Sequence, residues 1–422
     1  MPTVNDTLPR WLAWLEQLHP TEIELGLERV GRVADRLKLR PAPMPLILVG
    51  GTNGKGSTVT LLSNIYRAAG YKVGAYTSPH IELFNERMCI NGDMLDDQTI
   101  VDALHTVESA REPETLTYFE YTTLAAMVAF VRNGCTVAVM EVGLGGRLDA
   151  TNLWDCDCAI LTSIALDHQA YLGNSRESVA REKVAIGRSG KPMIVGEPDP
   201  PDNLANMALS AGMQLQFIDN EHLPNSALSG QHQQRNAACA VAAVAVLQPV
   251  LPVEQRAVDT GLSTVYLPGR FECITVEQQA VVLDVAHNPA AADALALALQ
   301  ARFPDHQVLA VFSALKDKDI VGIASALAPV VSSWYCAELC ADRAMLLSDL
   351  VESVSQSVSA SEVPVHGFAS VVKAWRAATD AAGALPADQK SVILVAGSFF
   401  TLTELRESAV FIQANHQNGT AT

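Results

Sequence analysis

Residues 50–57 read Gly-Gly-Thr-Asn-Gly-Lys-Gly-Ser, a combination of residue types that suits the binding of phosphate groups. Glycines let backbone N–H groups approach an anion closely, the N-terminus of a following helix attracts negative charge, and Lys55 adds a positive charge. The run follows the apolar residues 46–49 and precedes a helical pattern over 58–69. Because it lies between an expected strand and an expected helix, we predict a nucleotide phosphate loop.

The spacing of this loop differs from the usual G-x-x-x-x-G-K-[ST] pattern. One residue fewer separates Gly50 from Gly54, and Gly56 stands between Lys55 and Ser57. A glycine-rich turn that only closes a strand is therefore the alternative interpretation.

Apolar runs that alternate with helical stretches surround the loop, at residues 46–49, 72–77, 137–142, 158–164 and 192–195. This alternation predicts an α/β fold with a P-loop-type, doubly wound, mainly parallel sheet. In such sheets ligands bind beyond the carboxyl ends of the strands. Residues that follow the strands are therefore the candidates for chemistry.

Potential metal ligands stand at the ends of three of these strands. Ser78 follows the second strand, Glu141 lies at the end of the third, and Asp167 and His168 follow the fourth. Oxygen ligands suit Mg²⁺ held against phosphates, so the sequence predicts a metal site beside the loop. Each residue also has a purely structural interpretation, as a strand-end carboxylate, a turn residue or a helix cap.

Two further segments are candidates for substrate contacts. The glycine-rich loop 143–152 is expected to cover the substrate, although a surface loop without chemical function is the alternative. Thr117 is a plausible cap for a helix that begins with Tyr118 and Phe119. These two rings could form an aromatic wall for a flat substrate or a buried pair.

Composition limits the class of protein. The chain has 422 residues, of which 49% are hydrophobic, and a net charge of −17. This length predicts two domains, and the negative charge argues against general affinity for nucleic acid or anionic membranes. Residues 1–10 lack the pattern of an export signal, and the eight cysteines are scattered. We therefore expect a cytoplasmic protein with reduced thiols.

A domain junction is expected where periodicity is lost, around Pro268-Gly269. We predict one domain over residues 1–268 and a second, smaller, Rossmann-like α/β domain over 269–422. The second domain has expected strands at 281–285, 308–312, 333–336 and 392–396. Arg270 at the junction and Asp284 at a strand end could each reach a nucleotide.

The order of motifs along the chain adds a resemblance. The motifs are G-T-N-G-K-G-S, T-S-P-H, T-Y-F-E, E-V-G-L-G-G-R-L-D-A-T-N, L-D-H, R-E-K, L-P-G-R-F and D-V-A-H-N-P. In this order they resemble the folylpolyglutamate synthases, especially the bacterial bifunctional enzymes that are also dihydrofolate synthases. These enzymes belong to the Mur ligase superfamily of ATP-dependent amide ligases. The resemblance extends from about Leu12 to Phe399.

The resemblance implies roles for particular residues. The residues implied for the ATP phosphates are Thr52, Asn53, Gly54 and Lys55, and those implied for the rest of the nucleotide are Asn236, Arg270 and Asp284. One Mg²⁺ would be bound by Ser78, Glu141 and His168. A second would be bound by Lys183 after carbamylation by CO₂, although the sequence pattern alone favours a solvated helix lysine. The residues implied for dihydropteroate are Glu22, Ile23, Glu24, Leu25, Thr117, Tyr118, Phe119, Glu120, Leu148, Asp149 and Ala150.

The implied reaction joins L-glutamate to dihydropteroate or to reduced folates through an acyl phosphate. His287 would help to seat the glutamate or the acyl phosphate, or would only stabilise a turn. Gln169 and Phe400 depart from residues that are frequent in the family, and Phe400 argues against a polar role there. A monomer is expected. The alternatives are a Mur-type ligase for another carboxylate and a nucleotide-driven switch protein.

Overall fold

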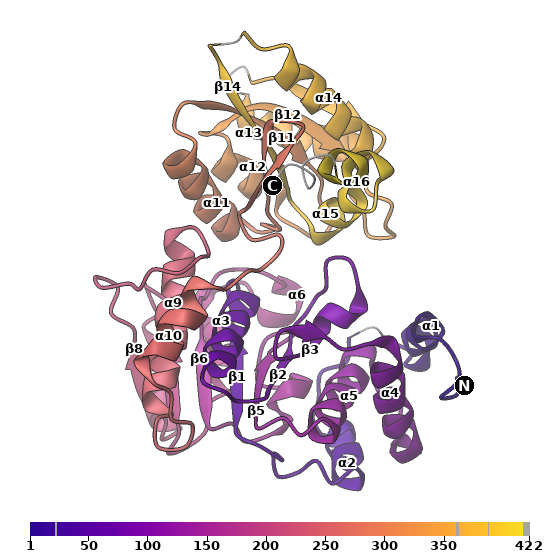
Figure 1. Cartoon of the computed structure of the whole chain (residues 1–422), viewed down its shortest axis with the longest axis vertical. Coiled ribbons are helices and arrows are strands. Elements are labelled where there is room, and N and C mark those ends of the chain that lie inside the picture. The colour runs from indigo at the N-terminus through magenta and orange to yellow at the C-terminus, as the bar shows by residue number, and fades with distance from the viewer. Residues whose placement is uncertain (22, 360–362, 387, 417–422) are drawn as a thin grey trace. The chain divides into compact units, whose positions relative to one another are not determined.

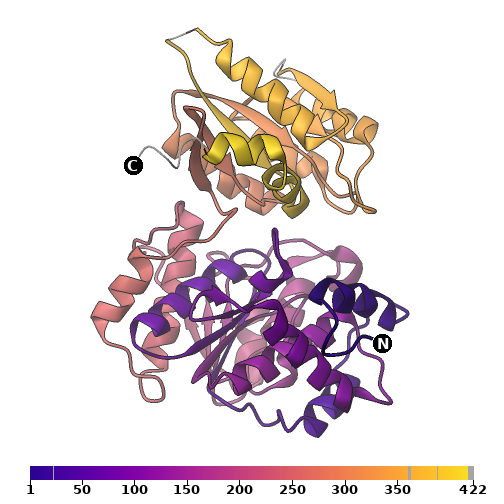
Figure 2. The same cartoon turned by 45° about the vertical axis from the view of Figure 1, so that its right-hand side comes forward.

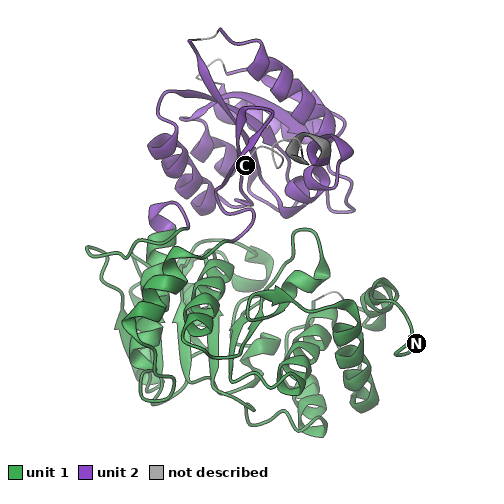
Figure 3. Cartoon of the chain, in the orientation of Figure 1, with its two compact units in different colours: residues 1–227, 233–266 green, residues 228–232, 267–422 purple. Residues whose placement is uncertain are grey.

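The chain divides into two compact units in a computed structural model that describes residues 1–21, 23–359, 363–386 and 388–416. Unit 1 comprises Met1–Ala227 and Gln233–Tyr266, and unit 2 comprises Leu228–His232 and Leu267–Thr422 (Figure 3). Glu22, one of the expected dihydropteroate residues, lies outside the described residues.

Unit 1 is built on an eight-stranded sheet with the strand order β4-β3-β2-β5-β1-β6-β7-β8 (Figure 1). Neighbouring strands run parallel from β2 to β8, whereas β3 and β4 pair in antiparallel fashion at one edge. The strands are β1 (Leu46–Gly50), β2 (Val73–Tyr76), β3 (Met88–Ile90), β4 (Asp93–Met94), β5 (Val137–Glu141), β6 (Cys158–Leu161), β7 (Pro192–Val195) and β8 (Gln214–Phe217).

Helices cover both faces of this sheet. They are α1 (Leu8–Leu18), α2 (Glu28–Arg36), α3 (Lys55–Ala68), η1 (Phe84–Arg87), α4 (Asp97–Arg111), α5 (Tyr118–Arg132), η2 (Ala150–Leu153), α6 (Gln169–Leu172), α7 (Arg176–Val184), α8 (Asn203–Ser210), α9 (Gln231–Val246) and α10 (Gln255–Ser263). Helix α3 packs against α10, and α1, α2, α4 and α5 pack together as a separate group. In Figure 2 the N-terminal helices and the helices α9 and α10 lie on opposite sides of unit 1.

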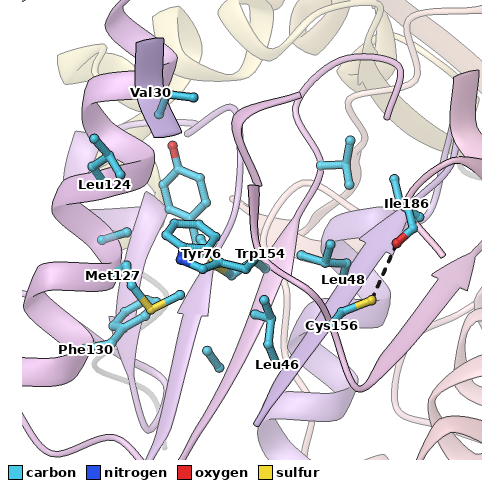
Figure 4. Close-up of a cluster of buried hydrophobic side chains, with 14 of the residues drawn as sticks. Val30, Leu46, Leu48, Tyr76, Leu124, Met127, Phe130, Trp154, Cys156 and Ile186 are labelled. Carbon is cyan, nitrogen blue, oxygen red and sulfur yellow. Dashed lines mark hydrogen bonds between the residues drawn. The ribbon is translucent and has the colours of Figure 1, made fainter. Parts of the chain in front are cut away.

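The alternation of side chains along β1 explains this two-sided core. Successive residues of a strand point to opposite faces, and all five residues of β1 are buried. Leu46 and Leu48 join the core cluster that also contains Val30 of α2 and Phe130 of α5 (Figure 4). Because β1 is central and buried on both faces, the phosphate loop that follows it begins at a firmly packed position.

Unit 2 contains a six-stranded sheet with the order β13-β12-β11-β14-β10-β9, parallel except for β9. Its strands are β9 (Glu272–Val276), β10 (Gln279–Leu283), β11 (His306–Phe312), β12 (Val331–Ala337), β13 (Val365–Phe368) and β14 (Lys390–Ala396). Its helices are α11 (Pro289–Arg302), α12 (Ile320–Leu327), α13 (Leu347–Val358), α14 (Val371–Gly383), α15 (Phe399–Arg406) and α16 (Ala409–His416).

The predicted fold class is confirmed, since both units have mainly parallel sheets with alternating strands and helices. The expected helix 58–69 begins earlier, at Lys55, so that the lysine of the phosphate loop lies in its first turn. The strands β3, β4, β8, β9 and β13 were not predicted, because they lie at or next to a sheet edge and their partly exposed residues do not form a continuous apolar run. Within the described ranges, no helix combines the length and apolar character that a membrane crossing requires.

Candidate active site

The phosphate loop is hydrogen-bonded to the segment that follows β6. The backbone N–H of Thr52 donates to the carbonyl of Ser163 at 2.8 Å, and the N–H of Asn53 donates to the Ser163 hydroxyl at 2.9 Å. The Thr52 hydroxyl donates to the carbonyl of Ala165 at 3.0 Å. These donors of Thr52 and Asn53 therefore fix the loop itself, and their expected contact with ATP stays a prediction.

Backbone N–H groups without intrahelical partners begin further along, at the start of α3. The first helical bond joins Thr58 N–H to the carbonyl of Gly54 at 3.0 Å, which leaves the N–H groups of residues 55–57 without intrahelical partners. Gly54 has a φ of +86°, and a Cβ there would collide with the side chain of Asn236. Asn236 thus lies in unit 1 beside the phosphate loop, in the buried part of α9.

Gly56 and Ser57 lie in the first turn of α3. A Cβ at Gly56 would lie 3.4 Å from Oε2 of Glu141, which places this turn next to the end of β5. The Ser57 hydroxyl is fully buried and has no hydrogen-bond partner among the described residues. A buried hydroxyl without a partner is costly, which is the expected condition of a group that serves a bound ligand.

Glu141 at the end of β5 brings several predicted residues together. Its Oε2 accepts a hydrogen bond from the backbone N–H of Ser78 at 3.1 Å, and its Oε1 lies 3.9 Å from Nζ of Lys55. Lys55 also donates to the carbonyl of Thr52 at 3.0 Å. The ends of β1, β2 and β5 therefore converge as expected for the carboxyl edge of a parallel sheet.

His168 occupies an exposed position with left-handed backbone, φ +50°, immediately before the one-turn helix α6. Its N–H donates to the Asp167 carboxylate at 2.8 Å. Within the described part of the chain, no three His, Cys, Asp or Glu side chains are grouped closely enough to hold a metal. A metal here would therefore depend on hydroxyl and phosphate oxygens as well, and His168 as a ligand stays a prediction.

Lys183 of α7 is buried, with 4% of its surface exposed, so its interpretation as a solvated lysine is wrong. Its Nζ donates to the carbonyl of Gly51 at 2.9 Å, directly under the phosphate loop. Burial, and secondly the charge of Lys55, lower the pKa of Lys183 to about 7. A large neutral fraction at neutral pH makes this amine a nucleophile, as reaction with CO₂ requires.

The loop 143–152 is packed onto α7. A Cβ at Gly146 would lie 2.6 Å from the carbonyl of Glu182, so only glycine allows this approach. Asp149 is buried and accepts hydrogen bonds from Leu144 N–H at 2.8 Å and from the N–H and hydroxyl of Thr151 at 3.0 and 2.6 Å. Burial nevertheless raises its pKa.

Asp149 therefore holds its own loop in shape. A carboxylate offers about four lone-pair positions, and the loop engages most of them. The expected contact of Asp149 with dihydropteroate stays a prediction, and the loop leaves little hydrogen-bonding capacity of the carboxylate for it. Leu148 is partly buried beside it, and Ala150 is buried at the start of η2.

The aromatic segment at the start of α5 faces the same edge. Phe119 lies against Gly143, where a Cβ would approach its ring to 2.5 Å, and its centroid is 5.9 Å from that of Tyr76. Tyr118 meets Phe84 edge to face at 6.1 Å. Both α5 rings are only partly buried, so their exposed parts could still contact a flat substrate.

Arg29 of α2 connects two of the predicted substrate segments. Its Nε donates to the buried carboxylate of Glu120 at 2.9 Å, and its guanidinium also pairs with Glu24. Glu120 in turn forms a capping box with Thr117, which confirms the predicted cap. Ile23 and Leu25 flank Glu24 in the same irregular segment. No sequence signal indicates Arg29, because Glu120 lies 91 residues away.

The candidate residues of unit 2 surround the end of β10. Asp284 is buried and accepts hydrogen bonds from the N–H groups of Phe271 at 2.7 Å and Ala286 at 2.8 Å. Burial raises its pKa. Both carboxylate oxygens therefore hold backbone turns, a role that does not depend on a nucleotide.

Arg270 and His287 share one aromatic neighbour, Phe399 at the start of α15. The Arg270 Cζ lies 5.1 Å from the Phe399 centroid, and the His287 ring centroid lies 5.9 Å from it. Nδ1 of His287 is 2.8 Å from the Val285 carbonyl, so Nδ1 carries the proton and donates. Phe399 had no predicted role, whereas the adjacent Phe400 is 46% exposed.

Comparison with known proteins matches both parts of the chain. The model of the Mur ligase middle domain matches residues 49–200, and that of the Mur ligase, glutamate ligase domain matches residues 269–399. The fold and the phosphate-loop site thus define a Mur-type ligase.

Individual relatives extend along nearly the whole chain. The dihydrofolate synthase/folylpolyglutamate synthase of Escherichia coli (strain K12) is 42% identical over 425 residues, which span 96% of this chain and 96% of that protein. The structure of E. coli FolC in complex with DHPP and ADP has a TM-score of 0.87 and 41% identity, covering 96% of this chain and 98% of its own. The Yersinia pestis c092 bifunctional enzyme complexed with AMPPNP and Mn ion has a TM-score of 0.85 and 40% identity, with coverage of 96% and 98%. The chain belongs to the dihydrofolate synthase/folylpolyglutamate synthase family, as the order of motifs predicted.

Proposed function

We propose that the chain is an ATP-dependent ligase that joins L-glutamate to dihydropteroate, forming dihydrofolate, and to reduced folates, forming folylpolyglutamates. The main support for this proposal is that Lys55 and the backbone N–H of Ser78 both contact the carboxylate of Glu141. It combines a phosphate loop with an acidic strand end, the arrangement that activation of a carboxylate by ATP needs. Similarity to enzymes of that name over 96% of the chain supports the same activity.

The reaction consists of two displacements. A carboxylate oxygen of the substrate attacks the γ-phosphorus of ATP, and the bond from that phosphorus to the β–γ bridging oxygen breaks, which releases ADP. The amine of glutamate then attacks the acyl carbon, loses a proton and expels phosphate. Lys55 and the N–H groups of residues 55–57 would neutralise and orient the phosphates.

The residues present fit a divalent cation beside the loop. The unpartnered hydroxyl of Ser57 and the carboxylate of Glu141 are hard oxygen donors in one neighbourhood of the phosphate loop. Ser78, Glu141 and His168 would hold one Mg²⁺ and carbamylated Lys183 a second. When bound, Mg²⁺ would offset the negative charge of the phosphates. The buried, weakly basic amine of Lys183 supports the carbamate, since its nitrogen can attack CO₂ and release a proton.

The two domains would divide the work. Residues 1–268 would bind ATP and the pterin, and residues 269–422 would bind glutamate and complete the nucleotide site with Arg270 and Asp284. His287, whose Nδ1 donates to the Val285 carbonyl, would help to seat the glutamate or the acyl phosphate. Residues 23–25, 117–120 and 148–150 would bind dihydropteroate. We expect a monomer in the cytoplasm.

The decisive experiment measures ADP release with ATP and Mg²⁺, with dihydropteroate and glutamate present singly and together. The proposal expects turnover only with both, together with formation of dihydrofolate detected by mass. Rapid turnover with neither substrate would instead favour a nucleotide-driven switch. Turnover only with another carboxylate acceptor would favour a different Mur-type ligase.

A further inference from the structure

Arg87 is the last residue of η1 and has no role in the site described above. Its carbonyl accepts a hydrogen bond from Thr77 N–H at 3.0 Å, which places Arg87 beside the strand end that carries Ser78. It is partly buried. The residue therefore stands next to the proposed reaction site while facing the aromatic segment of α5.

The guanidinium of Arg87 is held on three sides. Its Nε donates to Nδ1 of His80 at 2.8 Å. Its Cζ lies 5.7 Å from the ring centroid of Phe84 and 5.7 Å from that of Tyr118. Cation–π contacts and the hydrogen bond fix the plane of the guanidinium, so little conformational entropy remains to be lost when a ligand binds.

The two terminal amino groups of Arg87 have no hydrogen-bonding or ionic partner in the part of the chain that the structure describes. The nearest acidic neighbour in sequence, Glu86, is already engaged. Its carboxylate accepts from the N–H groups of Ile81, Glu82 and Leu83 at 2.7, 2.7 and 2.8 Å. A fixed guanidinium with both terminal groups open matches the planar, bidentate geometry of a carboxylate.

We propose that Arg87 binds the non-reacting carboxylate of the glutamyl group on folate substrates, an inference that rests on the proposed function. The reacting carboxylate has to keep an oxygen lone pair for attack on ATP, and a bidentate arginine would withdraw its charge. Dihydropteroate carries only that reacting group. Dihydrofolate differs from it by one glutamyl unit, which brings a second carboxylate. Arg87 thus distinguishes the two classes of substrate and favours the glutamylated one.

The test compares binding of this matched ligand pair to the full chain. Dissociation constants for dihydropteroate and dihydrofolate are measured for wild type, Arg87→Met and Arg87→Lys. Loss of a charge-assisted bidentate contact should weaken dihydrofolate binding roughly 10- to 100-fold in Arg87→Met, with less than about 3-fold change for dihydropteroate. Arg87→Lys should recover only part of the loss, because an ammonium lacks the fork.

Arg67→Met is the matched control. Arg67 is exposed on α3 and donates to the carbonyl of Asn91 at 3.0 Å, just beyond the end of β3, whereas Arg87 directly precedes the start of β3. Both dissociation constants should be unchanged in this variant. Thermal unfolding of each variant checks that the protein stays folded.

Several outcomes would overturn the inference. Equal weakening of both ligands in Arg87→Met would show a general effect on the pocket, and a raised KM for ATP with unchanged folate binding would show a phosphate contact. If wild type bound neither ligand and formed no dihydrofolate from dihydropteroate, the proposed function itself would fail. Wild-type activity with no selective effect of Arg87 would contradict the inference alone.

Discussion

Lys183 in unit 1 and Asp284 in unit 2 are both buried ionisable groups near the carboxyl ends of parallel strands, but their surroundings differ. Asp284 accepts two backbone N–H groups. Lys183 has one carbonyl as its acceptor, and Lys55 nearby adds repulsion that lowers its pKa. Burial shifts the pKa of both groups against the charged form, but two backbone donors hold the acid, whereas the amine has a single acceptor and a like charge nearby. A buried ionisable group whose desolvation is not offset by hydrogen bonds is typical of a functional site. A buried group whose hydrogen bonds offset it is typical of a structural role.

The largest expected effect concerns activity at Lys183. Lys183→Met should lower the rate of ADP formation with both substrates by roughly 10- to 100-fold, the scale seen when groups that support a metal site are removed. A short carboxylate added to the buffer should restore part of the activity of Lys183→Ala, since it replaces the carbamate. Lys191→Met is the control, because Lys191 is half exposed and pairs with Asp157 on the surface. Normal activity of Lys183→Met would contradict a functional role for Lys183.

The second prediction concerns the pH dependence of stability. The folded pKa of Lys183 is about 7, whereas the unfolded value is that of an ordinary lysine, 10.5. Between these values the unfolded state binds more protons, so the free energy of unfolding should rise with pH. The rise is up to about 1.4 kcal/mol per pH unit and is present in wild type but absent in Lys183→Met. Denaturant unfolding of both proteins between pH 7 and 10 measures this rise. The same pH dependence of the free energy of unfolding in both proteins would contradict a buried, neutral amine.

The third prediction concerns Asp284. An asparagine can accept only one of the two hydrogen bonds, because its NH₂ group faces the other N–H donor. Asp284→Asn should therefore lower the free energy of unfolding of unit 2 by about 1–3 kcal/mol. Hydrogen exchange at the amides of Phe271 and Ala286 reports the loss locally. Asp293→Asn on the exposed side of α11 is the control and should change neither quantity. Unchanged protection of both amides from hydrogen exchange would contradict a structural role for Asp284.

The smallest effect is expected at Ser57, within α3. Its hydroxyl has no described partner, so Ser57→Ala should change the free energy of unfolding by no more than about 0.5 kcal/mol. Ser63 of the same helix donates to the Val59 carbonyl at 2.8 Å, and Ser63→Ala should lose about 0.5–1.5 kcal/mol. If Ser57 serves the bound nucleotide and metal, only its variant should raise the KM for ATP. A large loss of stability in Ser57→Ala would show that the hydroxyl is satisfied after all.

Much of the fold was predictable because parallel strands buried on both faces form continuous apolar runs. The five strands expected in unit 1 correspond to β1, β2, β5, β6 and β7. In the same unit β3, β4 and β8, which lie at or next to the sheet edges, were missed because they are partly exposed. Burial, rather than residue type, produces the periodic signal on which such predictions depend.

The sequence also indicated which residues gather at the sheet edge, since the topology of a parallel sheet places successive strand ends together. The meeting of Ser78 and Lys55 at Glu141 follows from that rule. Hydrogen-bond partners do not follow from it, because they depend on residues distant in the chain. Asp149 gave no sequence signal that its own loop would engage it, and Arg29 gave none that it would join Glu24 to Glu120.

The sequence by itself determined the phosphate loop, the α/β class and the family, because these depend on local residue order and on long motifs. The tertiary structure decided the chemical state of individual groups. Lys183 reads as an ordinary helix lysine until the packing of α7 beneath Gly51 removes it from water. Arg87 was not singled out in the sequence, and it is the contacts with Phe84, Tyr118 and His80 that fix its guanidinium. The solvation and the orientation of a side chain depend on residues that are near in space but distant in the sequence. They determine the pKa of Lys183 and the ability of Arg87 to bind a ligand.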